Sequence, residues 1–251
     1  MAVGIERGDV LNLKVQSIGL SILSLAALAI FAWPFLPFGL NPELASWLGM
    51  FAISVVLVLT LMLLDGDLVG PKQIALIAVL AAVGASVRIA TGGTGGIELV
   101  FLTVILAGRA FGPRFGFLLG VATIAISSLF FGGFGPWTAF QMFATGWVGA
   151  GAGLLFGKGH RFENFLLAGY GVLSAYVFGL LLNLWFWPVA VTGASLSYEP
   201  GAGAFENLSS FLLFSLASST LTWDTVRAIS LAVVLVLVAK PALRALSRAK
   251  L

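Results

Sequence analysis

The sequence predicts an all-α, polytopic membrane protein built as a bundle of helices. Of its 251 residues, 60% are hydrophobic and only 9% are charged, whereas a soluble domain carries about 25% charged residues. So few charges cannot cover a water-facing surface of this size. The mean hydropathy of +1.09 and the length of the apolar runs also indicate membrane spans.

Composition excludes several other classes of protein. The chain has no cysteine, which excludes disulfide frameworks, thiolate zinc sites and cysteine nucleophiles. Its single histidine, His160, leaves no room for a His-rich metal site, so we expect no metal and no cofactor. A net charge of +3 on so apolar a chain does not indicate nucleic-acid binding, and the placement of basic loops explains it better.

Eight apolar runs predict the helices of the bundle. They are 16–36, 44–64, 73–90, 97–108, 115–131, 138–157, 163–190 and 208–240. We interpret the first as a retained span, because it is longer than a signal-peptide core and no small-x-small cleavage site follows it. The fourth is short for a bilayer of about 30 Å, so it must be tilted, partly extended or sheltered by neighbours.

Basic residues alternate between the two sides of the predicted bundle. The N-terminal arm and the loops 65–72, 109–114 and 158–162 carry seven of the thirteen Lys and Arg residues, and the opposite loops carry none. This pattern places the N-terminus in the cytoplasm by the positive-inside rule. The tail KPALRALSRAK holds four more, so the C-terminus should also be cytoplasmic, which requires an even number of spans.

The last run, at 33 residues, is too long for one span. Splitting it in two would place the basic tail outside. We therefore expect 208–222 to be an external or pocket-lining helix that leads into the final span.

Four ionisable residues, Arg88, Glu98, Asp224 and Arg227, fall near the predicted outer ends of spans. Charges at membrane depth are costly and usually mark a functional site. The alternative is internal pairing of Arg88 with Glu98, or of Asp224 with Arg227 one helical turn on. Both interpretations stay open, and they are compatible.

Small residues recur every four positions in the glycine series 112, 116, 120 and 149, 153, 157. Such stripes let membrane helices approach closely. Ala75, Ala78, Ala81, Ala82 and Ala85 form a similar smooth face, which we expect to meet another helix of this chain or of a partner.

Aromatic and polar residues gather at the predicted outer surface. Trp137, Trp187, Gln141, Asn183 and Tyr198 share this level with Asp224 and Arg227. An aromatic belt is one explanation; a small-molecule pocket with aromatic walls and a few polar groups is another. Gln141 and Asn183 need a partner inside apolar spans, either each other or a ligand.

Catalytic and nucleotide motifs are missing. GAGLLFGKG (151–159) fails as a phosphate-binding loop because Ala152 and Gly159 stand where Gly and Ser or Thr are needed, and no strand precedes it. No HExxH or GxSxG motif occurs. We expect no catalytic residue and no enzyme. If the protein transports a solute actively, its energy source lies on another chain or in an ion gradient.

From Lys72 onward the chain resembles the substrate-binding S components of energy-coupling factor (ECF) vitamin transporters. The resemblance is carried by KQIALIAVLAAVGASVRI (72–89), GGTGGIELVFLTVILAGRAFGPRFGFLLG (92–120), GPWTAFQMFATGWVGAGAGLLFG (135–157) and LNLWFWP (182–188). It is closest to the cobalamin-type branch. It implies two extra N-terminal transmembrane helices (1–70) followed by a six-helix S-component core (71–251).

The resemblance also implies a function. An S component binds its vitamin at the outer face of a prokaryotic plasma membrane and delivers it inward by docking on a transmembrane coupling (T) subunit driven by two ABC ATPases. The residues it assigns to substrate are Arg88, Thr91, Trp137, Gln141, Asn183, Trp187, Tyr198, Asp224 and Arg227, and Glu98 joins them as the neighbouring acid. The positions it assigns to docking are Ala75, Ala78, Ala82 and Ala85.

Two other functions fit the sequence less well. A self-sufficient secondary transporter would need an ion site near the membrane midplane, yet the acidic residues lie near span ends. A membrane enzyme acting on lipid would need clustered catalytic groups, and the sequence has none.

Overall fold

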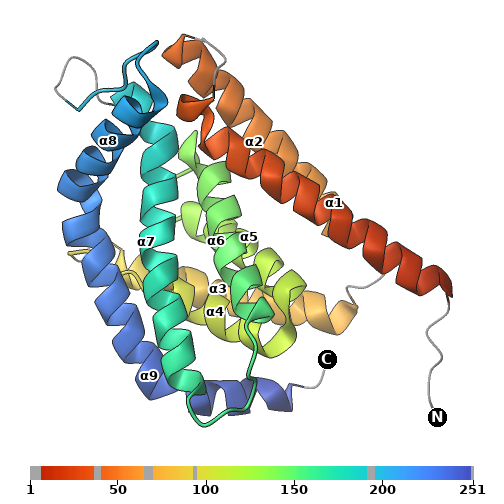
Figure 1. Ribbon diagram of the computed structural model, residues 1–251. Coiled ribbons are helices and arrows are strands. Elements are labelled where there is room, and N and C mark those ends of the chain that lie inside the picture. The colour runs from red at the N-terminus through yellow and green to blue at the C-terminus, as the bar shows by residue number, and fades with distance from the viewer. Residues whose placement is uncertain (1–6, 37–40, 65–69, 93–94, 191–195, 250–251) are drawn as a thin grey trace.

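The computed structural model describes residues 7–36, 41–64, 70–92, 95–190 and 196–249, and within them all regular secondary structure is helical (Figure 1). Its elements are α1 (Arg7–Phe31), η1 (Trp33–Phe35), α2 (Pro42–Leu64), α3 (Pro71–Thr91), α4 (Val100–Phe111), α5 (Pro113–Ser128), α6 (Trp137–Leu154), α7 (Glu163–Ala190), α8 (Ala204–Ser215), η2 (Leu216–Asp224) and α9 (Thr225–Arg248). The all-α membrane bundle that the sequence predicts is confirmed.

Each predicted apolar run overlaps a helix of the structure. Among the described residues, four helices are long and apolar enough to cross a membrane: Glu43–Met62, Pro71–Thr91, Glu163–Val189 and Ala204–Arg248. The short fourth run is α4, whose 12 residues extend about 18 Å. Most of its residues are buried, from Val100 to Arg109, so neighbouring helices shelter it.

The last predicted run forms one continuous stretch of helix. Residues 204–248 make a bent helical rod of 45 residues, whose end turns across the bundle (Figure 1). The segment 208–222, expected as an external or pocket-lining helix, leads into the final span without a break. Residues Leu216–Asp224 in the middle of the rod are π-helical, a wider geometry that is frequent at functional sites.

Glycines bring α5 and α6 together, as the sequence predicts for small-residue stripes. A Cβ atom on Gly149 would overlap the carbonyl oxygen of Gly116, and one on Gly120 would overlap the backbone of Thr145. Only glycine permits this approach of two backbones. Gly157 is an exception to the predicted stripe, because it lies beyond the end of α6 with φ +74° and open space around it.

The alanine face of α3 is divided between the core and the surface. Ala81 and Ala85 are buried, where α3 packs on α5. Ala75, Ala78 and Ala82 are exposed. The docking role that the resemblance implies for Ala85 does not fit its burial inside the bundle, whereas Ala75, Ala78 and Ala82 lie on the surface.

The N-terminal hairpin α1–α2 packs against α6 and α7. Phe31 is fully buried and meets the ring of Phe140 edge-on at 4.9 Å. Trp147 donates a hydrogen bond from Nε1 to Ser24 (3.3 Å), and Ile53 of α2 is also fully buried. The hairpin thus shares its hydrophobic core with the later helices of the chain.

The two ends of the bundle differ in chemistry. The α6–α7 loop and the end of α9 lie at one end, the bottom of Figure 1. We call this the basic end, since it holds Lys158, Arg161, Lys240, Arg244 and Arg248. The element η1, the start of α2 and α8 lie at the opposite end.

Candidate substrate-binding site

Two arginines and two carboxylates from three parts of the chain form one buried network. Glu98, just before α4, lies between the two arginines: its Oε2 is 2.8 Å from Nη2 of Arg227 and its Oε1 is 3.7 Å from Nε of Arg88. Arg227 also donates from Nη1 to Oδ1 of Asp224 at 2.7 Å. Both pairs that the sequence suggested are present, and Glu98 joins them into a single network.

The network is balanced in charge and mostly shielded from solvent, with the Glu98 side chain its most exposed member at 21%. Asp224 is 1% exposed and Arg88 is 6% exposed. Burying two positive and two negative groups together is tolerable because each finds an opposite charge and further hydrogen bonds. A low-polarity environment strengthens such a network while it is complete and makes a missing member costly.

Uncharged polar side chains continue the network on both sides. Arg88 donates from Nη1 to Oγ of Ser127 (2.7 Å) and from Nη2 to Oε1 of Gln141 (3.1 Å). On the other side, Ser219 donates to Oδ2 of Asp224 (2.9 Å), and Asn183 donates to the hydroxyl oxygen of Ser219 (2.8 Å). Gln141 and Asn183 therefore have partners, but they do not pair with each other.

Backbone features of the surrounding elements bring these groups together. Ser219 and Asp224 both lie on the π-helical segment η2. Gly179 of α7 leaves the space that the Asp224 carboxylate occupies, since a Cβ there would overlap it. Gly96, with φ +90°, approaches the backbone of Trp223 closely and turns the chain into Glu98.

Aromatic rings flank the charged groups. The guanidinium of Arg88 lies 5.6 Å from the ring centre of Phe131, and that of Arg227 lies 5.4 Å from Phe178. Both distances fit cation–π contacts. Nearby, Phe140 stacks on Trp185 at 4.9 Å.

Two buried donors on the helices that form this site have no hydrogen-bond acceptor among the described residues. They are Nε1 of Trp185 and Nε of Arg88, and the latter lies 3.7 Å from Oε1 of Glu98, within an ion pair but beyond hydrogen-bond length. A buried unsatisfied donor is rare and needs an explanation, of which a bound ligand is one.

A separate aromatic cluster lies farther along α7. Trp187 is fully buried and packs against Tyr198, Phe211 and Phe35, and its Nε1 donates to the carbonyl of Leu196 at 2.7 Å. Trp33 contacts Tyr198 from η1. Partial burial raises the pKa of Tyr198 above its ordinary value, so its phenol stays neutral. Trp187 lies about 13 Å beyond Phe178 along the helix.

The structure therefore divides the ten residues proposed for substrate binding. Six form the network: Arg88, Glu98, Gln141, Asn183, Asp224 and Arg227. Trp187 and Tyr198 belong to the aromatic cluster. Thr91 accepts a long hydrogen bond from the amide of Leu99 (3.4 Å) and so ties the end of α3 to the segment before α4. Trp137 is 38% exposed at the start of α6.

Several residues that the sequence reasoning missed also belong here. Ser127 and Ser219 complete the coordination of Arg88 and Asp224, and Phe131 and Phe178 lie on the arginines. A serine or phenylalanine inside an apolar run carries no signal of its own. Trp33 and Phe35 of the N-terminal extension, outside the region of resemblance, join the aromatic cluster; in the sequence alone an aromatic belt was sufficient to explain Trp33.

The fold and the site define a multi-pass helical membrane protein with a buried polar and aromatic site formed by several of its helices. A family model described as ECF-type riboflavin transporter, S component, matches residues 70–248. The chain belongs to this family, as the sequence resemblance predicted. It is a substrate-specific, vitamin-binding subunit of a transporter and not an enzyme. Comparisons with curated proteins and with solved structures gave no match.

Proposed function

We propose that the chain captures a flavin-type vitamin at the outer face of a prokaryotic plasma membrane and delivers it inward as part of an ECF importer. The family to which it belongs is that of ECF-type riboflavin transporter S components. The cobalamin-type branch suggested by the sequence is the second candidate. By the positive-inside rule, the basic end and both termini are cytoplasmic.

The observation that carries the choice of ligand is the charge-balanced network flanked by aromatic rings. Riboflavin is uncharged at neutral pH and combines a flat ring system with a hydroxyl-rich chain. Aromatic faces suit such a ring system, and a small set of placed donors and acceptors suits the hydroxyl groups. The donor left unsatisfied on Trp185 is the first group that we assign to the ligand, followed by the guanidinium of Arg88, which already shares Glu98 with Arg227.

The other subunits of the importer, a coupling subunit and two ATPases, would be separate protein chains. A transmembrane coupling subunit would dock on the exposed alanines of α3, namely Ala75, Ala78 and Ala82. Two ABC ATPases would then drive release of the vitamin. The support for this division is family membership together with the exposure of these three small side chains.

Equilibrium binding to the purified chain tests the proposal. Riboflavin fluorescence is titrated in detergent, with cobalamin as competitor. Saturable one-to-one quenching that excess cobalamin leaves unchanged is the expected result. Displacement by cobalamin would transfer the assignment to the second candidate, and no saturable binding of either vitamin would refute both.

A further inference from the structure

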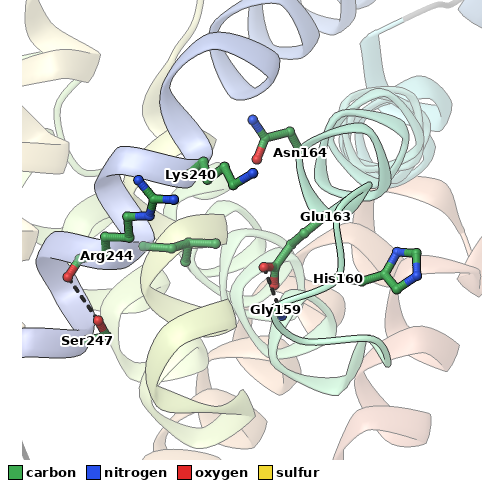
Figure 2. A pocket seen from close by; sticks show the side chains of 8 residues that line it. Gly159, His160, Glu163, Asn164, Lys240, Arg244 and Ser247 are labelled. Carbon is green, nitrogen blue, oxygen red and sulfur yellow. Dashed lines mark hydrogen bonds between the residues drawn. The ribbon is translucent and has the colours of Figure 1, made fainter.

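A cavity of about 270 Å³ lies at the basic end, between the start of α7 and the end of α9. Its polar lining includes Glu163 and Asn164 from α7 and Lys240 and Arg244 from α9. Figure 2 shows Lys240 extending from α9 toward α7 with Arg244 beside it, whereas the ring of His160 points away. This cavity is distinct from the candidate vitamin site, which lies at the start of α9.

The wall of the cavity on the α6–α7 side is held in place by Arg109. This side chain is 1% exposed; it donates to Oε1 of Glu163 at 2.7 Å and to the carbonyls of Leu155 and Phe156. The other carboxylate oxygen of Glu163 accepts the Gly159 amide at 3.0 Å. The loop that borders the cavity is therefore fixed before any ligand enters.

The cavity is positive. Arg109 neutralises Glu163, and neither Lys240 nor Arg244 pairs with a carboxylate in the part of the chain that the structure describes. The two cations are one helical turn apart on α9, so they point to the same side of the helix.

An apolar groove of about 300 Å³ continues along the same face of α9. It is lined by Ala232, Val233, Val236 and Leu237, which precede Lys240 and Arg244 at helical spacing. Asn164 links the two regions, since it lines the cavity and donates to the carbonyl of Val236 at 2.8 Å. From Ala232 to Lys240 the helix rises about 12 Å, a distance that part of an acyl chain spans.

Pro241 sets the geometry at the junction. It lies inside α9, where its missing N–H and its ring bend a helix. Figure 1 shows the end of α9 turned across the bundle. The apolar part of α9 therefore follows the bundle, and the basic part crosses its end.

We propose that this face of α9 binds one anionic phospholipid, with its phosphate between Lys240 and Arg244 and an acyl chain in the apolar groove. Basic pockets between helices at the cytoplasmic surface are suited to such headgroups. The exposed apolar side chains around the loop, Leu154 (73%), Phe156 (83%) and Phe165 (64%), place the cavity at the boundary of the hydrocarbon. A soluble phosphate would use only the cationic half of this surface.

Native mass spectrometry of the detergent-purified full chain tests the proposal with defined lipids. Dioleoyl phosphatidylglycerol is compared with dioleoyl phosphatidylcholine, with dihexanoyl phosphatidylglycerol and with inorganic phosphate. We expect the long-chain anionic lipid alone to be retained. The double substitution Lys240→Gln and Arg244→Gln should weaken its retention by roughly 25-fold, about fivefold for each cation. Arg248→Gln, which removes a charge one turn farther on, should change it less than twofold, because Arg248 does not line the cavity.

Three results would overturn the proposal. Equal retention of the two dioleoyl lipids by the unmodified protein would mean that the site does not recognise the phosphate charge. Binding of inorganic phosphate or of the short-chain lipid at the same concentration would assign the site to a soluble anion. Undiminished retention by the double variant would place the lipid elsewhere. Riboflavin binding, measured in parallel, reports folding of the variants and is expected to be unchanged.

Discussion

Glu98 shows at the level of single residues why the buried charges are interdependent. It is the carboxylate that Arg88 and Arg227 share, whereas Asp224 serves Arg227 and Ser219. Removing one partner from a buried ion pair leaves an uncompensated charge and costs more than the pair itself contributes. A substitution at these positions can therefore alter both ligand affinity and folding, and separate measurements are needed for the two effects.

Replacing Arg88 or Asp224 by Ala should weaken vitamin binding without preventing membrane insertion. A hydrogen bond to a charged group contributes about 1.5–3 kcal/mol, so we expect a loss in affinity of roughly tenfold to a hundredfold from each change. Isothermal titration of the purified variants measures the loss. Lys72→Ala, at the exposed opposite end of α3, is the matched control. Unchanged affinity in both variants would make these charges structural.

The glycine contact between α5 and α6 gives a test of packing with an internal control. Gly149→Ala places a methyl group on the carbonyl of Gly116 and should destabilise the protein by about 1–3 kcal/mol. Gly169→Ala, on an exposed helical face with open space around it, should stabilise it by about 0.5–1 kcal/mol. Thermal unfolding in one detergent compares them, and shifts of the same sign would contradict the close packing.

Whether a contact between two side chains could be predicted depended on how far apart the two residues lie in the sequence. Asp224 and Arg227 are one turn apart, and Arg88 and Glu98 are separated by one short loop, so both pairings could be anticipated from spacing. The contact between Arg227 and Glu98 joins residues 129 positions apart, and no local pattern encodes it. For the same reason the pairing of Arg109 with Glu163 across the basic end was not anticipated.

At the scale of secondary-structure elements, hydropathy predicted where the helices lie in the sequence but not the geometry within them. The run 163–190 agrees with α7 at both ends, because long apolar segments bounded by turns are a strong signal. The π-helical geometry of Leu216–Asp224 has no such signal, since it depends on packing that places Asp224 against Gly179. Helix α3 is an intermediate case: its small residues predicted contact with another helix of this chain or of a partner, but not which of them lie inside the bundle, as Ala81 and Ala85 do.

The exposed half of α3 should be required for assembly and dispensable for binding. Ala78→Leu and Ala82→Leu enlarge side chains that face away from the bundle. We expect vitamin affinity to stay within about twofold of the original and co-purification with the coupling subunit to be lost. Leu173→Phe, which enlarges a 60% exposed side chain on α7, should leave both unchanged. Normal transport by the Ala78→Leu and Ala82→Leu variants would show that this face of α3 does not dock on the coupling subunit.

At the scale of the whole molecule, the family match covers only one of two parts of the chain, although the two parts pack together in the structure. The match begins at residue 70, so α1, η1 and α2 lie outside it. Yet Phe31 packs on Phe140, and Phe35 packs on Trp187. The sequence could identify the hairpin as an addition, but only the three-dimensional contacts show that it covers the aromatic cluster.

Transport should depend on partners that this chain does not contain. Vesicles containing the chain alone are expected to bind the vitamin without accumulating it, under either a proton or a sodium gradient. Adding the coupling subunit and the two ATPases should give uptake that requires ATP inside. Scintillation counting of labelled vitamin measures both states, and gradient-driven accumulation by the chain alone would instead establish a secondary transporter.

The neutral sum of the four buried charges also restricts how this chain can change over evolutionary time. A single substitution at Arg88, Glu98, Asp224 or Arg227 passes through an intermediate with one uncompensated charge in the bundle, which carries a large penalty. Exchange at these positions should therefore be concerted, with an acid and a base lost or reversed together. Related sequences aligned to this one are expected to show Glu98 varying jointly with both arginines, and Asp224 with Arg227.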